Sequence, residues 1–304
     1  MQPFASICNY AVGKFYWNIN YPFILPSLLS FDQKFEPNPY WAKTLLYFLS
    51  EASQGNIKIT YKRNNFYMAL RFVFMVLEEH PYGREMLRVL LENNLVPSII
   101  IQEVSAVSDL EREKFLKRIA GQPVPPRMTE LITGKKIPFY CVGNHNDTTS
   151  LELLVANQPD ILVLGGTRII KQNILQIPTR GTVNAHPGLL PMLRGSASVG
   201  WALYKDLPQG ATAHFIDPGI DTGDIIIKSE LPVYHHDTYE SLNYRIGRLS
   251  GELMAKSLQH IENGTVNRTH QDPGVGETFK VIPDDLLKEG IRRLESGHYS
   301  HYAD

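Results

Sequence analysis

From residue 68 onward, short apolar runs alternate with segments of helical periodicity. The apolar runs span 70–77, 96–104, 137–142 and 160–166, and helical segments separate them at 82–94, 109–121 and 148–157. A strand that is apolar at every position must be buried on both faces, which a parallel sheet covered by helices provides. The sequence therefore predicts an α/β fold with a mainly parallel, doubly wound, Rossmann-like sheet. Ligands of such sheets bind beyond the carboxyl ends of the strands.

Two of these predicted helices are bounded by a residue typical of a helix end. The segment 109–121 is charged and amphipathic and ends on Gly121, a residue typical of helix C-termini. The segment 148–157 follows Asp147, whose carboxylate suits an N-cap. We expect a helix between each of these pairs of boundaries.

The C-terminal half continues the alternation. A strand from 181 runs into a loop that two prolines keep from becoming helical. Further on, the pattern predicts helices at 196–206 and 239–262, a strand at 211–217 and another apolar strand after a glycine-bearing turn at 218–223. The last elements are a short strand within 276–282 and an amphipathic helix within 283–297.

The length of 304 residues fits two domains, or a single α/β domain with appendages. We divide the chain into an N-terminal extension of unclear structure, 1–67, a catalytic domain, 68–266, and a C-terminal tail with a helix, 267–304. The extension is dense in aromatic residues and proline, and its one convincing helical segment is 40–52.

Charge and hydropathy exclude several classes of protein. A formal net charge of −1 provides no long-range attraction for polyanions, so we expect no nucleic-acid partner. No apolar run reaches the roughly 18 residues of a membrane helix, and no secretory signal is legible. The two cysteines are too few for a disulfide framework or a zinc site. We expect a cytoplasmic protein, and a homodimer is compatible with the sequence.

The densest group of chemically competent side chains is Asn184, His186 and Asp221. Asn184 and His186 alternate at the end of a predicted strand, so their side chains point to the same side. There the amide can donate to a developing oxyanion, and the imidazole can move protons near neutral pH. Asp221 lies in a glycine-flanked turn, and a carboxylate beside a histidine orients its ring. On general loop statistics the same residues serve equally well as a turn cap, a buried imidazole and an Asx-turn.

Three separate segments carry a family resemblance. The sequences NAHPGLLPMLRG and ATAHFIDPGIDTGDI resemble the catalytic core of the folate-dependent formyltransferases, and the small-molecule and amino-sugar N-formyltransferases are the nearest in kind. The shared features are an Asn-x-His pair, an LLP-x-x-x-G loop and a downstream Asp in a D-x-G turn. They fall on Asn184, His186, 189–191 with Gly195, and Asp221 with Gly223. The resemblance extends over 68–266 and is strongest over 159–228.

The resemblance implies a cofactor site and a reaction. In relatives, the loop after the strand that precedes Asn-x-His lines the folate pocket, and the turn containing the Asp closes its other side. The corresponding residues here are Thr167, Arg168, Ile169 and Ile170 in the loop, with Gly219 and Ile220 in the turn. An amine would attack the formyl carbon of 10-formyltetrahydrofolate, and Asn184 and protonated His186 would hold the oxyanion. Asp221 would keep His186 charged or position a water, with no metal required.

The resemblance leaves the acceptor amine open. Purine-pathway members hold a substrate phosphate in a Gly-Ser-rich loop after the first strand, where this chain has Glu78 and Glu79. Methionyl-tRNA members carry a sizeable C-terminal domain, for which 267–304 is too short. We therefore expect a small-molecule amine, with amino-sugar nucleotides as the familiar precedent. The alternatives are a 10-formyltetrahydrofolate hydrolase and a catalytically inert folate- or nucleotide-binding regulatory module.

Two further sets of residues have more than one interpretation. Arg194 suits either a ligand contact or an ordinary solvated surface position. His214 and Asp217 suggest a metal site only weakly, because strand alternation puts them on opposite faces. We expect Ala variants of His186 and Asp221 to fold normally, since both residues are predicted to lie in loops.

Overall fold

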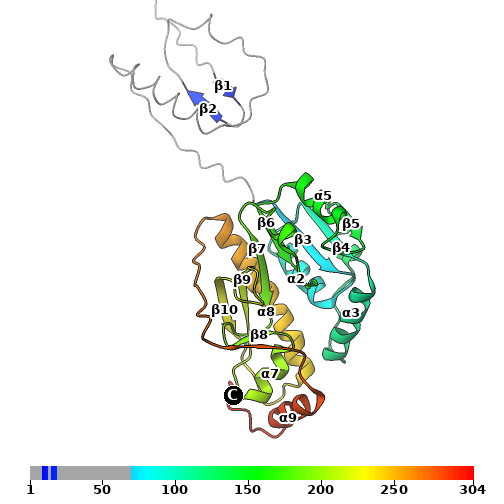
Figure 1. Cartoon of the computed structure of the whole chain (residues 1–304), viewed down its shortest axis with the longest axis vertical. Coiled ribbons are helices and arrows are strands. Elements are labelled where there is room, and N and C mark those ends of the chain that lie inside the picture. Colours follow the sequence, from blue (N-terminus) through cyan, green and yellow to red (C-terminus); the bar gives the residue numbers. More distant parts are fainter. Residues whose placement is uncertain (1–8, 13–14, 19–69) are drawn as a thin grey trace, which may run out of the picture. The chain divides into compact units, whose positions relative to one another are not determined.

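The structure, a computed structural model, describes residues 9–12, 15–18 and 70–304 (Figure 1). The chain divides into two compact units, Met1–Phe66 and Tyr67–Asp304. In the first unit, strands β1 (Asn9–Val12) and β2 (Phe15–Asn18) form an antiparallel pair. The predicted helix at 40–52 lies outside the described residues.

The second unit alternates strands and helices, as the apolar pattern predicts. Its strands are β3 (Phe72–Leu77), β4 (Ile99–Glu103), β5 (Phe139–Val142), β6 (Ile161–Leu164), β7 (Thr182–His186), β8 (Leu193–Gly195), β9 (Gly210–Phe215), β10 (Ile225–Glu230) and β11 (Glu277–Phe279). Its helices are α2 (Pro81–Glu92), α3 (Ala106–Arg118), α4 (Met128–Leu131), α5 (Thr148–Asn157), α6 (Gln172–Leu175), α7 (Ser198–Lys205), α8 (Tyr239–Glu262) and α9 (Asp284–Glu295).

Seven strands form one sheet in the order β10-β9-β7-β6-β3-β4-β5. The five strands from β7 to β5 are parallel, while β9 runs antiparallel to β7 and β10 antiparallel to β9. The chain builds outward from β3 to β4 and β5, and then returns to the other side of β3 with β6. This reversal is the point where α/β sheets hold ligands, beyond the carboxyl ends of the strands.

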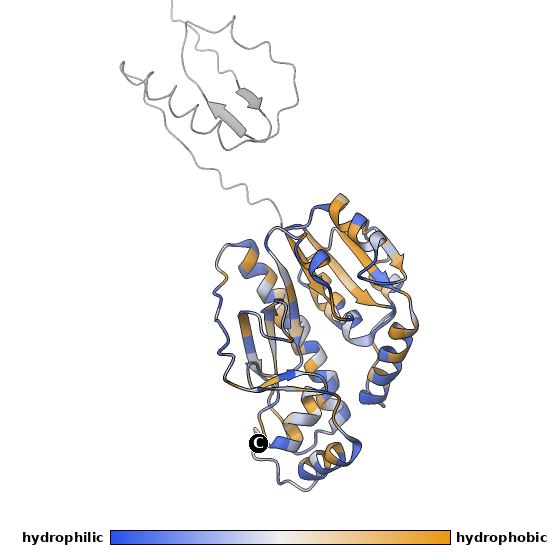
Figure 2. Ribbon diagram, in the orientation of Figure 1, coloured by the Kyte–Doolittle hydropathy of each residue, from blue (hydrophilic) through white to orange (hydrophobic). Residues whose placement is uncertain are grey.

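Both faces of the sheet are covered. Alternate residues of β3 enter two different cores: Phe72, Phe74 and Val76 pack with α2 and α8, whereas Val73 and Met75 pack with α5 and α6. Figure 2 shows the central strands coloured hydrophobic along their length. This double burial confirms the doubly wound α/β sheet and explains why these strands are apolar at every position.

The observed helix boundaries can be compared with the capping residues expected from the sequence. Asp147 caps α5 by accepting a hydrogen bond from the Ser150 N–H, and the helix spans the predicted residues. The prediction for 109–121 was wrong at both ends. A capping box between Ser105 and Ser108 starts α3 at Ala106, and the helix ends at Arg118, before Gly121. A serine at the third helical position, rather than the usual Glu or Gln, makes this box hard to recognise in the sequence.

The segment 267–304 packs onto the rest of the second unit. Strand β11 pairs in parallel with β8, and α9 packs against α7 through apolar contacts with Leu287 and Ile291. Gly195 in β8 has φ of +90°, and a Cβ there would lie 2.1 Å from the carbonyl oxygen of Phe279 in β11. The close pairing therefore requires glycine. Among the described residues, no helix is long and apolar enough to cross a membrane.

Candidate active site

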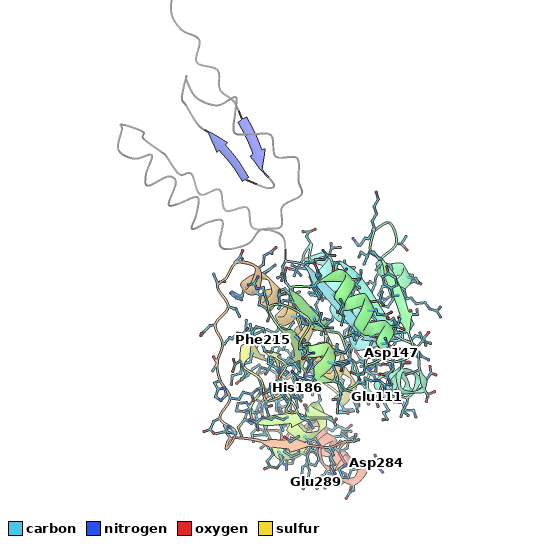
Figure 3. All side chains as sticks on the ribbon, turned by 45° about the horizontal axis from the view of Figure 1, so that its top comes forward. Glu111, Asp147, His186, Phe215, Asp284 and Glu289 are labelled. Carbon is cyan, nitrogen blue, oxygen red and sulfur yellow. The ribbon has the colours of Figure 1, made fainter. Side chains whose placement is uncertain are left out.

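Strand β7 carries two of the predicted site residues to the carboxyl edge of the sheet. His186 is its last residue, and Asn184 lies two positions earlier, so both side chains project from the same face. Figure 3 shows His186 inside the unit, and its side chain is only 3% exposed. His186 is therefore a buried strand residue, and the expectation that it lies in a loop was wrong.

Both ring nitrogens of His186 have partners. Nδ1 lies 3.3 Å from Oδ2 of Asp221, and Nε2 lies 2.7 Å from the carbonyl oxygen of Leu193. The hydroxyl of Ser198 is 3.1 Å from the same Nε2. A doubly protonated ring would donate to a carboxylate on one side and to a carbonyl on the other. The structure thus brings His186 and Asp221 together, as the motif spacing predicts.

Asp221 is held in a strained turn by main-chain and side-chain contacts. Its φ of +54° is one that aspartate and asparagine adopt more readily than most other residues. Its Oδ2 accepts a hydrogen bond from the Gly195 N–H at 2.8 Å. The Gln271 side-chain amide donates to the carbonyl oxygens of Asp221 and Gly223, at 2.9 and 2.7 Å. Gln271 lies beyond 266, so the predicted tail supports the site directly.

Asn184 faces a histidine that the motif did not include. The Asn184 Nδ2 lies 3.5 Å from Nε2 of His214 on the neighbouring strand β9, and that Nε2 is 3.6 Å from Oδ1 of Asp221. The Nδ1 of His214 pairs with the Phe215 carbonyl oxygen at 2.8 Å. Because a carbonyl only accepts, Nδ1 carries the proton, and neutral His214 presents Nε2 as an acceptor to Asn184.

The pKa of His214 agrees with a neutral ring. Burial, partly opposed by the charge of Asp221, lowers the pKa of His214 to about 4. The ring is therefore neutral at pH 7. The sequence signal for His214 was a lone imidazole inside the apolar strand of 211–217, but its partner depends on how β9 pairs with β7.

Asp217 organises the turn by accepting two hydrogen bonds. Its Oδ1 accepts hydrogen bonds from the Gly219 N–H at 3.0 Å and from the Thr222 hydroxyl at 2.6 Å. These contacts leave Ile220 at the tip of the turn, where its side chain is 53% exposed. An apolar side chain exposed beside Asp221 suits contact with a flat organic ligand.

The loop after β6 leaves the sheet sharply. Gly166 has φ of +82°, a backbone conformation that glycine permits, as the glycine pair at 165–166 predicts. Beyond it, Thr167 is half-buried and Ile169 is 82% exposed. Ile170 instead points into the core that β3 and β4 share with α5. Of the two predicted isoleucine contacts in this loop, Ile169 presents its side chain to solvent, and Ile170 does not.

Arg168 is held by a buried carboxylate. Its Nε lies 3.0 and 2.9 Å from the two oxygens of Glu103, the last residue of β4, and its Nη2 pairs with the same carboxylate. Glu103 is fully buried and also accepts from the His145 backbone N–H at 2.8 Å and the Ser105 hydroxyl at 2.6 Å. Burial raises the pKa of Glu103, but the hydrogen bonds from Arg168 and Ser105 hold it below its ordinary value. The guanidinium of Arg168 thus anchors the loop.

The interpretation of Arg194 as a solvated surface residue was wrong. Its side chain is buried, with Nε 3.4 Å from the Gln271 side-chain oxygen and Nη2 3.3 Å from the Asp272 carbonyl oxygen. Arg194 therefore positions Gln271, which in turn holds the Asp221 turn.

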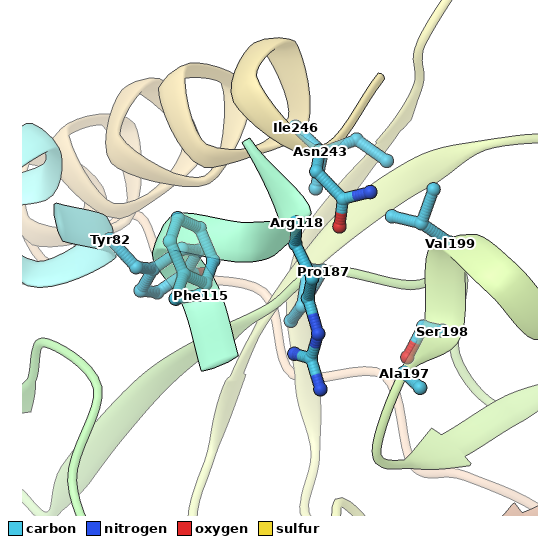
Figure 4. Close-up of a pocket in the computed structure, with 9 residues that line it drawn as sticks. All are labelled: Tyr82, Phe115, Arg118, Pro187, Ala197, Ser198, Val199, Asn243 and Ile246. Atoms are coloured by element: carbon cyan, nitrogen blue, oxygen red, sulfur yellow. The ribbon is translucent and has the colours of Figure 1, made fainter. Parts of the chain in front are cut away.

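A pocket opens next to the C-terminal end of β7 (Figure 4). Pro187, which follows His186, and Ser198, which contacts its ring, both line this pocket. The remaining lining residues come from α2, α3, the α7 N-terminus and α8: Tyr82, Phe115, Arg118, Ala197, Val199, Asn243 and Ile246. The pocket is mostly apolar, with a few polar groups directed at its interior, as is usual for small-molecule sites.

The two glutamates after β3 are engaged in ion pairs. Glu79 pairs with Arg84 at 2.8 Å, and Glu78 pairs with Arg112 at 3.3 Å. Their carboxylates occupy the region where a phosphate-binding loop would need backbone N–H groups and glycine. Each of these carboxylates is thus already neutralised by a guanidinium.

Known proteins share both the sequence and the fold. A methionyl-tRNA formyltransferase from Chlamydia caviae is 31% identical over 199 residues, covering 65% of this chain and 61% of the relative. The corresponding enzyme from Methylacidiphilum infernorum is 34% identical over 189 residues, covering 62% and 56%. The chain thus spans less than two thirds of these relatives. Both relatives are named for a tRNA substrate. The comparisons therefore do not support the expectation of no nucleic-acid partner.

Two solved structures share the fold. A phosphoribosylglycinamide formyltransferase from Anaplasma phagocytophilum has a TM-score of 0.52 at 22% identity, covering 69% of this chain and 99% of that one. A sugar N-formyltransferase from Shewanella sp. also has a TM-score of 0.52, at 16% identity, covering 74% and 87%. The formyl transferase family matches residues 71–258, which is more than half of the chain and includes Asn184, His186 and Asp221. The chain belongs to the formyl transferase family.

Proposed function

We propose that this protein transfers the formyl group of 10-formyltetrahydrofolate to a primary amine of a small molecule. The observation that carries the proposal is the convergence of three groups at the carboxyl edge of the sheet: the Asn184 amide, the His186 imidazole and the Asp221 carboxylate. Family membership supplies the reaction class, and these residues have the chemistry that the reaction needs.

The proposed step is an acyl transfer between two nitrogens. The amine nitrogen forms a bond to the formyl carbon, and the carbonyl π electrons move to oxygen, which gives a tetrahedral intermediate. The Asn184 NH₂ group donates one hydrogen to His214 and keeps the other for the oxyanion. His186, beside Asp221, adds positive charge. Collapse breaks the bond from carbon to N10 of the folate, and the proton lost by the amine goes to that nitrogen.

We assign the folate to the loop 167–170 and the turn 219–220. The exposed side chains of Ile169 and Ile220 support this assignment, because they offer apolar contact on the two segments that flank the site. The ion pair of Arg168 with Glu103 holds the first segment in place. In this arrangement Thr167 and the backbone of Ile170 and Gly219 contribute polar contacts to the pterin ring.

The relatives' names favour a second acceptor, the amino group of methionyl-tRNA. The pocket beside His186 favours the small molecule, because apolar walls with a few polar groups are typical of small-molecule sites.

One assay tests the reaction and separates the acceptors. The full chain is incubated with 10-formyltetrahydrofolate and an amine from a panel of amino sugars, amino-sugar nucleotides, amino acids, simple amines and methionyl-tRNA. Tetrahydrofolate release and product mass are measured. A formamide from a small amine supports the proposal, and a formylated tRNA alone supports the second acceptor. Release of formate in water alone indicates a hydrolase, and no turnover under any condition contradicts both acceptors.

A further inference from the structure

The pocket beside His186 carries a single formal charge, and that charge is positive. Arg118, the last residue of α3, is the charged residue among its nine lining residues. In Figure 4 its side chain lies between Ser198 on one side and the rings of Tyr82 and Phe115 on the other. A half-buried guanidinium with apolar neighbours is stabilised by a negatively charged partner.

Nothing in the described part of the protein supplies that partner. Two other cations of α3 are paired: Arg112 with Glu78 and Asp109, and Lys114 with Glu111. The Arg118 side chain forms no ion pair or hydrogen bond with any residue of 70–304. The other pocket walls are polar only at the Ser198 hydroxyl, the Asn243 amide and the Tyr82 hydroxyl, and none of these is an anion that could pair with the Arg118 guanidinium.

The pocket is connected to the proposed chemistry through two of its walls. Ser198 touches the His186 ring at 3.1 Å, and Pro187 is its neighbour in the chain. A molecule in this pocket would have one end next to His186 and the other next to Arg118. The Asn243 Nδ2 donates to the Tyr239 carbonyl oxygen at 2.7 Å, which leaves its side-chain oxygen for a donor on that molecule.

We propose that Arg118 binds an oxyanion, such as a phosphate group, on the acceptor, and so selects amines that carry a negative charge at the end opposite the amino group. This inference rests on the proposed function. It places anion recognition at the C-terminal end of α3. The loop after β3 is not used for this, because Glu78 and Glu79 there are already paired with arginines. The apolar rings of Tyr82 and Phe115 would then pack against the body of the acceptor.

Matched pairs of amines test the charge selection. Ethanolamine is compared with O-phosphoethanolamine, and glucosamine with glucosamine 6-phosphate, using the full chain and 10-formyltetrahydrofolate. A charge-assisted contact of this kind predicts kcat/KM about tenfold to a hundredfold higher for the phosphorylated member. Arg118→Gln should remove this preference. Lys117→Gln, the same change of charge one residue earlier at an exposed position, should keep it. Equal turnover within each pair, or a preference that survives Arg118→Gln, overturns the inference while leaving formyl transfer intact.

A second measurement tests anion binding at Arg118 even if no amine is formylated. Phenylglyoxal modifies accessible arginines, and mass spectrometry of peptides reports each site. We expect O-phosphoethanolamine, but not ethanolamine, to slow the modification of Arg118. Arg248, which is half-exposed on α8 and does not line the pocket, should react equally in both samples. Unchanged labelling of Arg118 contradicts the anion site. Protection of Arg118 without any transfer retains the anion site and rejects the proposed function.

Discussion

Asn184 and His214 face each other across strands β7 and β9, with 3.5 Å between Nδ2 and Nε2. His214 donates through Nδ1 to a backbone carbonyl, so its Nε2 accepts, and this contact fixes which end of the Asn184 side chain is the nitrogen. An amide turned the other way would present its oxygen to the developing oxyanion and repel it. The neutral state of a buried histidine therefore determines the orientation of the proposed oxyanion donor.

The first prediction concerns this orientation. His214→Leu removes the acceptor and should lower kcat for formyl transfer by about tenfold to a hundredfold, because Asn184 can then rotate away from its donating position. His214→Gln offers a side-chain oxygen as a replacement acceptor and should recover part of the loss. Steady-state kinetics with the best amine of the panel measure both variants. If His214 only fills space, leucine will be tolerated better than glutamine, which contradicts the orienting role.

The second prediction concerns the charge of Asp221. Asn has nearly the same shape, tolerates the φ of +54° and can still accept from the Gly195 N–H, so Asp221→Asn should change the free energy of unfolding by less than about 1 kcal/mol. It removes the negative charge 3.3 Å from His186 and should lower kcat by about a hundredfold or more. Denaturant unfolding and turnover are measured on the same preparation. Full activity in a folded Asp221→Asn protein would remove the carboxylate from the mechanism.

The sheet could be predicted from the sequence because its central strands β3 and β6 are apolar at every position. A run such as 70–77 fits few environments other than the centre of a sheet with helices on both faces, and β3 occupies that environment. The Asn-x-His pair and the D-x-G turn could be recognised because their spacing is local. His186 and Asp221 then meet through the strand order, which places β9 beside β7.

The supporting contacts of the site could not be predicted in the same way. Arg168 reaches Glu103 across 65 positions of sequence, and Arg194 reaches Gln271 across 77. A charged residue at the end of an apolar run, as in Glu103, indicates a function but does not identify the partner. The pairing of Asn184 with His214 depends on the antiparallel register of β9, which a shift of one residue would reverse. Such partners follow from tertiary packing rather than from periodicity.

The third prediction concerns the anchor of the proposed folate loop. Glu103→Gln leaves the half-buried Arg168 guanidinium without its carboxylate, which should cost about 3 kcal/mol of stability. Because the loop at 167–170 loses its anchor, the KM for 10-formyltetrahydrofolate should rise by about tenfold, with a smaller change in kcat. Lys114→Gln, which breaks an exposed ion pair with Glu111, is the control and should alter neither quantity. A loss of stability with an unchanged KM for 10-formyltetrahydrofolate would mean that Glu103 has only a structural role.

The fourth prediction concerns His80, which is buried at the start of α2 with its ring 5.1 Å from that of Phe115. Burial, aided by the charges of Arg118, Arg84 and Arg112, lowers the pKa of His80 from 6.5 to about 3. Between these two values the unfolded chain binds a proton that the folded protein does not. The free energy of unfolding therefore falls as the pH drops below 6.5, by up to about 1.4 kcal/mol per pH unit from this residue.

His80→Phe keeps an aromatic ring in place but removes the titration. Relative to the wild-type protein, the variant should gain about 2 kcal/mol of stability when the pH is lowered from 8 to 5, because only the wild-type unfolded chain is stabilised by protonation at residue 80. Urea unfolding at the two pH values gives this difference directly. The effect of the substitution on packing is the same at both pH values and therefore cancels. A difference independent of pH would mean that His80 is protonated in the folded protein, with its charge balanced inside the structure or by solvent.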